Sequence, residues 1–273
     1  MKEARQHRFT LPKGAADLLL IRHGETQAAV RGKRFPVCDG HGDPVLRPEG
    51  EAQAIAVAER LKSEPITAIY VTTLRRTQQT AAPLAAHLGI EPSIEKDLRE
   101  VFLGDWDAGE YRFRAVENDP AFVRARERDE WGEIPGAETT AELQARVRRG
   151  LLRIAGAHPD QLVTVVVHGG VVGAALSLST GARGWAFNGA ANGSISRLVV
   201  DQNRFIVRGF NDVSHLPPYP AASGACPGTF LEPQWSRDKP GTELRHRNHD
   251  FSQNLPILQQ FQRVPCLFQR VAC

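Results

Sequence analysis

Two histidines stand where two short apolar stretches end, and each is followed at once by glycine. His23 follows residues 17–21, and His168 follows residues 162–167. Short apolar runs predict buried strands, and the second run is apolar enough to be covered on both faces, as in a parallel sheet. Ligands bind outside the carboxyl ends of strands in open parallel sheets. The two histidines can therefore face one crevice, although each alone could equally be a hydrogen-bonded loop histidine.

Two arginines and one glutamate could complete a site for phosphoryl chemistry. A guanidinium group is a planar fork that binds two oxygens of a phosphate or carboxylate, and Arg22 directly precedes His23. Arg76 and Glu100 lie elsewhere in the chain. Each has an ordinary alternative, because most arginines form surface ion pairs and most glutamates are solvated. Only the whole set, taken together, points to chemistry.

Strand and helix patterns alternate along the first two thirds of the chain. Apolar, β-branched runs predict strands, and apolar residues at helical spacing predict helices. The further strand patterns lie at residues 66–71, 194–200 and 204–210, and the helical patterns lie at residues 49–61, 74–88, 139–157 and 169–179. This alternation indicates an α/β domain with a mostly parallel sheet.

Composition divides the chain into three parts. Residues 1–16 are polar and charged, which predicts a flexible N-terminal arm, and residues 17–216 hold the domain. Within the domain, residues 91–136 are expected to be irregular apart from a helix near residues 120–128. Residues 217–273 are rich in Pro, Gln and Arg without a sustained period, which predicts a poorly ordered tail. A small docked segment is the alternative for this tail.

Composition also excludes several classes of protein. The 273 residues are 41% apolar and 24% charged, which is typical of a globular chain. No apolar run approaches the roughly 18 residues of a membrane span, and a formal charge of +3 is too mild to indicate nucleic-acid binding. The four cysteines form no C-x-x-C pair, so neither a zinc site nor a disulfide framework is expected. We expect a cytoplasmic protein that binds neither nucleic acid nor a membrane.

Several motifs, in order along the chain, resemble the histidine phosphatase superfamily in its phosphoglycerate-mutase-like branch. Arg22-His23-Gly24-Glu25-Thr26 resembles the R-H-G-E-[ST] signature of that family. Residues 73–81 resemble the S-x-L-x-R-A-x-x-T-A segment, with its arginine at Arg76, and residues 98–106 resemble L-x-E-x-x-x-G-x-W, with its acid at Glu100. Residues 135–139 resemble P-x-G-E-S, and His168-Gly169-Gly170 resembles the second histidine motif.

The resemblance covers about residues 17–216 and implies a three-layer α/β/α fold of the phosphoglycerate-mutase type. The chain departs from the pattern at two places. Ala29 stands where the family often has asparagine, which removes one polar contact to a phosphoryl group. The first position of the second motif is taken as Thr73, where the family has serine.

The resemblance also implies a role for each candidate residue. His23 would attack phosphorus and form a phosphohistidine, and Glu100 would act as general acid and then general base. Arg22 and Arg76, together with a protonated His168 and the backbone of Gly169, would bind the phosphoryl oxygens. Because the arginines supply the positive charge, neither a metal ion nor a cofactor is expected. Acid catalysis needs a protonated carboxyl group, so we expect activity to favour mildly acidic pH.

Three functions remain open on this sequence. The first is a phosphatase that acts on small phosphorylated substrates, and the second is a phosphoglycerate-mutase-type phosphoryl transfer. The third is a non-catalytic relative that binds a phosphorylated ligand. Glu100 and His168 are separated by 68 residues (168 − 100), without the longer Arg- and Pro-rich insertion of the family's mutases, which favours hydrolysis. The natural substrate and the oligomeric state are not specified by the sequence, with a dimer among the alternatives.

Overall fold

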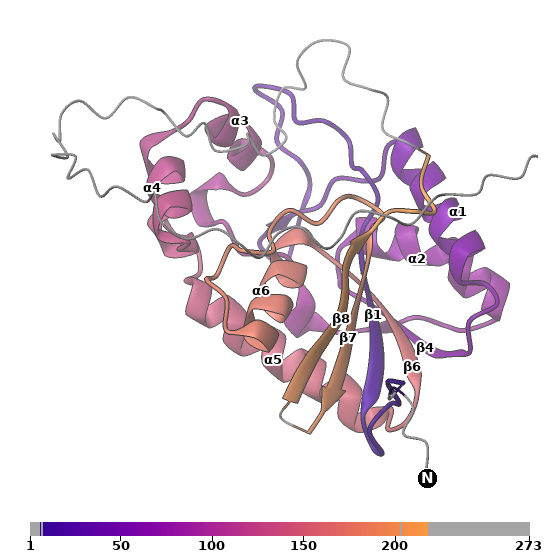
Figure 1. Cartoon of the computed structure of the whole chain (residues 1–273). Helices are drawn as coiled ribbons and strands as arrows, with labels where there is room; N and C mark the ends of the chain where they lie inside the picture. The colour runs from indigo at the N-terminus through magenta and orange to yellow at the C-terminus, as the bar shows by residue number, and fades with distance from the viewer. Residues whose placement is uncertain (1–5, 7, 203, 218–273) are drawn as a thin grey trace, which may run out of the picture. The chain divides into compact units, whose positions relative to one another are not determined.

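A computed structural model of the chain describes residues 6, 8–202 and 204–217. Six strands form one mixed sheet in the order β5-β4-β6-β1-β7-β8 (Figure 1). The pairs β4–β5, β4–β6 and β1–β6 are parallel, and the pairs β1–β7 and β7–β8 are antiparallel. The strands are β1 (Ala16–Arg22), β4 (Ile66–Val71), β5 (Ser93–Ile94), β6 (Leu162–Val167), β7 (Ile195–Asp201) and β8 (Arg204–Asp212).

Helices cover both faces of this sheet, so the described part of the chain is a three-layer α/β/α domain, as predicted. Leu18 and Leu20 of β1 face a core shared with α5 and α6, whereas Leu19 and Ile21 face a second core shared with α1 and α2. This alternation is the period of two expected of a strand buried on both faces. The helices are α1 (Pro48–Leu61), α2 (Arg75–Leu88), α3 (Glu110–Val116), α4 (Pro120–Arg128), α5 (Thr140–Ala157) and α6 (Gly169–Thr180).

The predicted elements agree with this architecture to within a few residues, except between residues 91 and 136. There the structure contains α3 as well as α4, together with the short strand β5. It also has three 3₁₀ turns, η1 (Lys96–Leu98), η2 (Gly104–Trp106) and η3 (Trp131–Glu133). Such short turns carry no repeating apolar period, so the prediction that only α4 lies in this region was wrong for a simple physical reason. A small hairpin, β2 (Val37–Cys38) with β3 (His41–Gly42), lies in the loop before α1.

Aromatic rings attach the segment between β5 and α5 to the rest of the domain. The Tyr111 ring contacts those of Trp106, Phe122 and Trp131, with centroid separations of 6.4, 5.9 and 6.1 Å. Trp131 in turn lies 4.2 Å from Trp185, which follows α6. These rings belong to the core that covers the α5 and α6 side of the sheet.

The structure tests the predicted start of the domain at residue 17. Ala15 and Ala16 are fully buried and β1 begins at Ala16, so the domain starts slightly before residue 17. The Pro-, Gln- and Arg-rich segment lies outside the described residues from residue 218 onward, and its order stays a prediction. None of the described helices is long and apolar enough to span a bilayer.

The N-terminus of α5 gives a test of the local structure. Thr139 and Glu142 form a capping box: Thr139 Oγ1 accepts the Glu142 N–H at 3.2 Å, and Glu142 Oε2 accepts the Thr139 N–H at 2.8 Å. We expect Thr139→Ala to lower the free energy of unfolding by about 1 kcal/mol, measured by urea denaturation. Ser63→Ala, at an exposed turn residue, is the control and should change it by less than about 0.5 kcal/mol. Equal effects of the two variants would contradict the assignment.

Candidate active site

The ends of two neighbouring parallel strands, β1 and β6, bring the two predicted histidines together. Arg22 pairs with Val167 in the β1–β6 register, so the next residues, His23 and His168, lie side by side. Their rings are 5.2 Å apart between centroids, at 63°. His23 is 7% exposed and His168 is fully buried. Both histidines therefore lie together at the carboxyl ends of the strands, where the sequence predicts a binding site.

His23 is held as a neutral ring with one defined tautomer. Its Nδ1 lies 2.8 Å from the carbonyl oxygen of Gly24. Because a carbonyl can only accept, Nδ1 carries the proton and Nε2 keeps its lone pair. Burial lowers the pKa of His23 well below its usual 6.5, and the positive charges of Arg76 and Arg22 lower it further. A neutral imidazole with a free Nε2 is the form that can act as a nucleophile.

Two predicted arginines lie beside this ring. Arg22 ends β1 and donates through NH1 to the carbonyl of Ala190 at 2.5 Å. Arg76 lies in the first turn of α2, is 7% exposed, and donates to the carbonyl of Gly42 at 2.9 Å. Burial lowers the pKa of Arg76 to about 10, against the opposing effect of nearby carboxylates. Arg76 thus stays protonated at neutral pH and contributes a desolvated positive charge.

A third arginine, Arg112, reaches the same site from α3. Its NH2 donates to Thr26 Oγ1 at 2.6 Å and its NH1 to the carbonyl of Gln27 at 2.7 Å. Desolvation and the neighbouring Arg22 lower the pKa of Arg112, and its charge contributes to the lowered pKa of His23. No motif distinguishes Arg112 from the other arginines of its region, so the sequence did not single it out.

His168 is held by Thr72, which occupies the motif position that was predicted for Thr73. Thr72 Oγ1 lies 3.1 Å from His168 Nε2 and is fully buried. Counting back from Leu74 and Arg76, the first position of the S-x-L-x-R pattern is Thr72, so its assignment to Thr73 was wrong. β4 ends at Val71 beside β6, which explains why Thr72 meets His168.

His168 is a neutral ring in this arrangement, and the protonated ring that the resemblance implies for a bound phosphoryl group stays a prediction. Burial lowers its pKa well below 6.5, and Arg76 and His23 lower it further. Its Nδ1 is buried and contacts no hydrogen-bond partner among the described residues. A buried polar atom is normally paired, so this nitrogen is a candidate contact for a bound anion.

Glu100 and Gly169 meet the histidines at the N-terminus of α6. Glu100 Oε1 accepts the N–H of Val101 at 3.0 Å and that of Gly170 at 3.1 Å. Gly169 is the first residue of α6, and a Cβ placed on it would lie 3.4 Å from Arg22 Nε. The first N–H groups of a helix have no acceptor within the helix and favour anions. All six predicted site residues therefore converge on one place.

The described residues place no group of three or more His, Cys, Asp or Glu side chains where it could hold a metal ion. Positive charge at this site comes from the guanidinium groups of Arg22, Arg76 and Arg112. The arrangement can bind an anion, offer a neutral nitrogen nucleophile and supply a carboxyl group, which together suit phosphoryl transfer.

Comparisons with known proteins agree with this geometry. The sequence model of the histidine phosphatase superfamily (branch 1) matches residues 18–213. The chain is 33% identical over 210 residues to phosphoglycerate mutase-like protein 4 of Arabidopsis thaliana, covering 74% of this chain and 87% of that protein. It is 30% identical over 204 residues to the "probable phosphoglycerate mutase GpmB" of Salmonella choleraesuis, covering 72% and 93%. The solved structure of a mycobacterial glucosyl-3-phosphoglycerate phosphatase matches with a TM-score of 0.61 at 26% identity, covering 72% of this chain and 99% of that one.

Gly170 tests the position of Glu100. A Cβ at Gly170 would overlap Val101 Cγ2 and come within 2.7 Å of Glu100 Oε1, so Gly170→Ala must displace that carboxyl group. We expect a loss of at least about tenfold in kcat for phosphoryl transfer, measured by phosphate release. The control is Gly156→Ala in α5, where a Cβ meets nothing within 4 Å. Similar rates for the two variants would contradict this placement of Glu100.

The buried histidines predict how stability depends on pH. Because the pKa values of His23 and His168 are lowered on folding, the unfolded chain binds more protons below pH 6.5. The stability from the neutral rings is complete above pH 6.5 and falls as the pH drops below it, by up to about 1.4 kcal/mol per pH unit for each ring. Urea denaturation at pH 7.5 and 5.5 should show a smaller pH dependence in His168→Gln than in the unmodified chain. His87→Gln, at an exposed position, should leave the dependence unchanged.

Proposed function

Because the chain belongs to the histidine phosphatase superfamily, branch 1, we propose that it hydrolyses small phosphate monoesters through a phosphohistidine on His23. The observation that carries this proposal is the buried, neutral His23 ring, whose Nδ1 donates to Gly24 and whose Nε2 is left as a nucleophile among arginines. The proposed reaction needs neither a metal ion nor a cofactor. A cytoplasmic location stays a prediction from the sequence.

Substrate binding begins with neutralisation of the phosphoryl dianion. Arg22 and Arg76 each offer a fork that can hold two oxygens, and a charged hydrogen bond of this kind contributes about 1.5–3 kcal/mol. The amides at the start of α6, including Gly169, add dipoles of the same sign. This removes the repulsion that otherwise keeps nucleophiles from a phosphate monoester.

A hydroxyl network sets the tautomer of His168. The Thr77 hydroxyl donates to the carbonyl of Leu74 at 2.8 Å and accepts the Thr72 N–H at 3.1 Å. The Thr72 hydroxyl lies 3.0 Å from the Thr77 hydroxyl and donates its proton there, so Thr72 Oγ1 accepts the Nε2–H of His168. A bound dianion would favour protonation of the remaining nitrogen, and the resulting Nδ1–H would donate to a phosphoryl oxygen.

The proposed reaction has two balanced steps. In the first, the lone pair of His23 Nε2 forms a bond to phosphorus while the bond from phosphorus to the leaving oxygen breaks. The leaving oxygen takes its proton from the Glu100 carboxyl group. In the second step, a water oxygen attacks phosphorus, gives a proton to the Glu100 carboxylate and displaces His23, which releases inorganic phosphate.

Phosphoglycerate-mutase activity is the second candidate, since two relatives carry mutase names. Hydrolysis is supported by the segment between Glu100 and His168, whose 68-residue separation lacks the longer insertion described above. Similarity to a mycobacterial phosphatase adds support. A covered pocket would be needed to keep water from a phosphohistidine during transfer to a second substrate.

Arg112 supports a substrate with a second anionic group. Arg22 and Arg76 already match the two charges of a phosphoryl group, so Arg112 is an additional cation, which α3 carries and which contacts the loop that follows His23. It could bind a carboxylate or a second phosphate. The contact that is lost at Ala29 lies in the same loop as the partners of Arg112.

Phosphate release tests the proposed function directly. We expect the chain to release phosphate from 4-nitrophenyl phosphate in the presence of EDTA, and from glycerol 3-phosphate faster at pH 5.5 than at pH 8.5. His23→Ala should lose all measurable activity because no phosphohistidine can form, whereas the exposed His87→Ala should retain it. Loss of activity in EDTA, or activity in His23→Ala, would contradict the proposal. Conversion of 3- to 2-phosphoglycerate well above the rate of hydrolysis would establish the mutase instead.

A matched pair of substrates tests Arg112. 3-Phosphoglycerate differs from glycerol 3-phosphate in having a carboxylate in place of a hydroxymethyl group. We expect a kcat/KM preference for 3-phosphoglycerate and a decrease in that preference of about tenfold in Arg112→Gln, from the loss of a charged hydrogen bond. Arg114→Gln, whose side chain is 42% exposed on the same helix, is the control. An unchanged preference in Arg112→Gln would exclude this role.

A further inference from the structure

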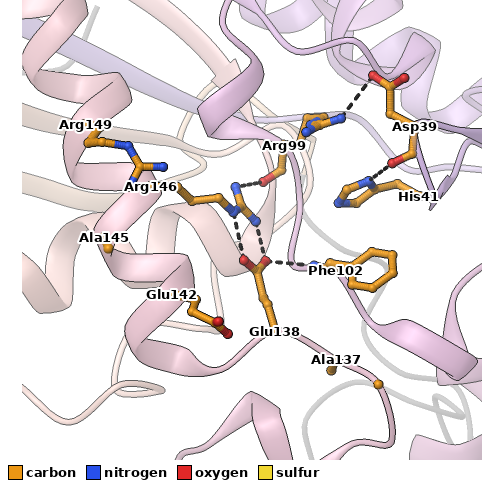
Figure 2. Close-up of a pocket in the computed structure, with 11 residues that line it drawn as sticks. Asp39, His41, Arg99, Phe102, Ala137, Glu138, Glu142, Ala145, Arg146 and Arg149 are labelled. Carbon is orange, nitrogen blue, oxygen red and sulfur yellow. Dashed lines mark hydrogen bonds and ion pairs between the residues drawn. The ribbon is translucent and has the colours of Figure 1, made fainter.

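Arg146, a residue outside the phosphoryl-binding set, contacts the backbone that carries Glu100. It projects from α5, and Figure 2 shows its guanidinium group between Glu138 and the chain at Arg99. Its NH1 donates to the carbonyls of Asp97 at 2.8 Å and Arg99 at 2.6 Å. Its NH2 donates to the carbonyl of Glu100 at 2.8 Å. Three carbonyls around the proposed acid are thus held by one side chain.

Glu138 completes this arrangement from the other side. It accepts from Arg146 Nε at 2.9 Å through Oε2 and from Arg146 NH2 at 2.5 Å through Oε1. Its Oε1 also accepts the N–H of Phe102 at 2.8 Å, and its own N–H donates to the carbonyl of Phe102 at 3.0 Å. Two donor contacts to Glu138 and three to carbonyls account for all five N–H groups of the guanidinium. The Arg146–Glu138 pair therefore holds the chain on both sides of Glu100.

The burial and location of this pair indicate more than general stabilisation. The two side chains are 15% and 13% exposed, and a buried ion pair by itself is weak evidence for stability. Both side chains also line an open hollow of about 680 Å³, together with Arg99 and Phe102 (Figure 2). Well-packed apolar residues in place of this ion pair would stabilise the fold at least as well, so stability alone does not explain the pair. The planar guanidinium group of Arg146 fixes the directions in which it donates to the three backbone carbonyls, and the ammonium group of a lysine cannot do this.

The backbone held by the pair determines where the Glu100 carboxyl group lies. Glu100 Oε1 meets the N–H of Gly170 at the start of α6, while the carbonyl of the same residue is bound by Arg146 and lies 3.0 Å from His41 Nε2. A rotation of the peptide at residue 100 would break these contacts together. General acid catalysis requires the carboxyl group within hydrogen-bond reach of the leaving oxygen, so a small displacement would reduce proton transfer.

We propose that Arg146 and Glu138 are positioning residues that aim the Glu100 carboxyl group at the leaving oxygen by holding the backbone of residues 97–102. This inference rests on the proposed function of Glu100 as the acid. It gives a role to Glu138, which the P-x-G-E-S resemblance includes without one, and to Arg146, which no motif indicates. Neither residue contacts the phosphoryl group in this assignment.

The dependence on the leaving group separates positioning of an acid from a general structural effect. 4-Nitrophenolate leaves with little need of a proton, whereas the alkoxide of glycerol 3-phosphate needs one. We expect Arg146→Lys to lower kcat for glycerol 3-phosphate at least about tenfold more than kcat for 4-nitrophenyl phosphate. Inhibition by inorganic phosphate, which reports the arginines at the binding site, should change less than about twofold.

Matched variants sharpen the test. Arg149→Lys, on the same helix and the same hollow but with a 59% exposed side chain, should keep the full rate on both substrates. In a Glu100→Gln background, Arg146→Lys should cause little further loss, because residues that act as a unit are not additive. Glu138→Gln keeps an acceptor for Phe102 and Arg146, and it should show the same preference for the aryl substrate. If Arg146→Lys lowers the melting temperature too far for assay, the Glu138→Gln variant provides the test instead.

The outcomes distinguish the two proposals. An unmodified chain that is inactive on both substrates overturns the proposed function, and the positioning role with it. An active chain in which Arg146→Lys and Glu138→Gln slow both substrates equally, or weaken inhibition by phosphate, overturns the positioning role alone. Rates in both variants equal to those of Arg149→Lys would also overturn it.

Discussion

The parallel pairing of β1 with β6 sets the position of the reacting groups. Its register ends at Arg22 opposite Val167, and the next residue of each strand is a histidine. Since β4 pairs with β6 on the other side, Thr72 follows at the same edge and holds one of those rings. Backbone hydrogen bonds along the sheet therefore determine a side-chain geometry that no local contact at the site could maintain alone.

The second constraint is the gathering of positive charge around neutral rings. Arg22, Arg76 and Arg112 would repel one another in a low-dielectric site. Burial is the main cause of the lowered pKa values of both histidines; all three arginines lower the pKa of His23 further, and Arg76 lowers that of His168. An anion removes this repulsion and gains the full strength of partly desolvated donors. The same charges that bind a phosphoryl group thus also preserve the lone pair that would attack it.

The sequence was sufficient for every strand of the sheet except β5, for the layers, and for the six site residues that the structure brings together, because long apolar runs and an ordered set of motifs carry strong signals. It failed for α3 and the 3₁₀ turns, which are too short to show a period. It also failed for Thr72, through an error of one position, and for Arg146. The role of Arg146 depends on backbone carbonyls that only the folded chain brings within reach, and no side-chain pattern records them.

The part of the chain from α3 to η3 packs on the domain through rings around Tyr111, including the Trp131–Trp185 contact. Apolar contacts of this kind are non-directional, so they tolerate rearrangement better than the hydrogen bonds that fix the strand ends. Mutations among these apolar residues can therefore accumulate over evolutionary time and change the surroundings of the site. The chemistry at the strand ends would be inherited unchanged, while the range of molecules it acts on diverges between lineages.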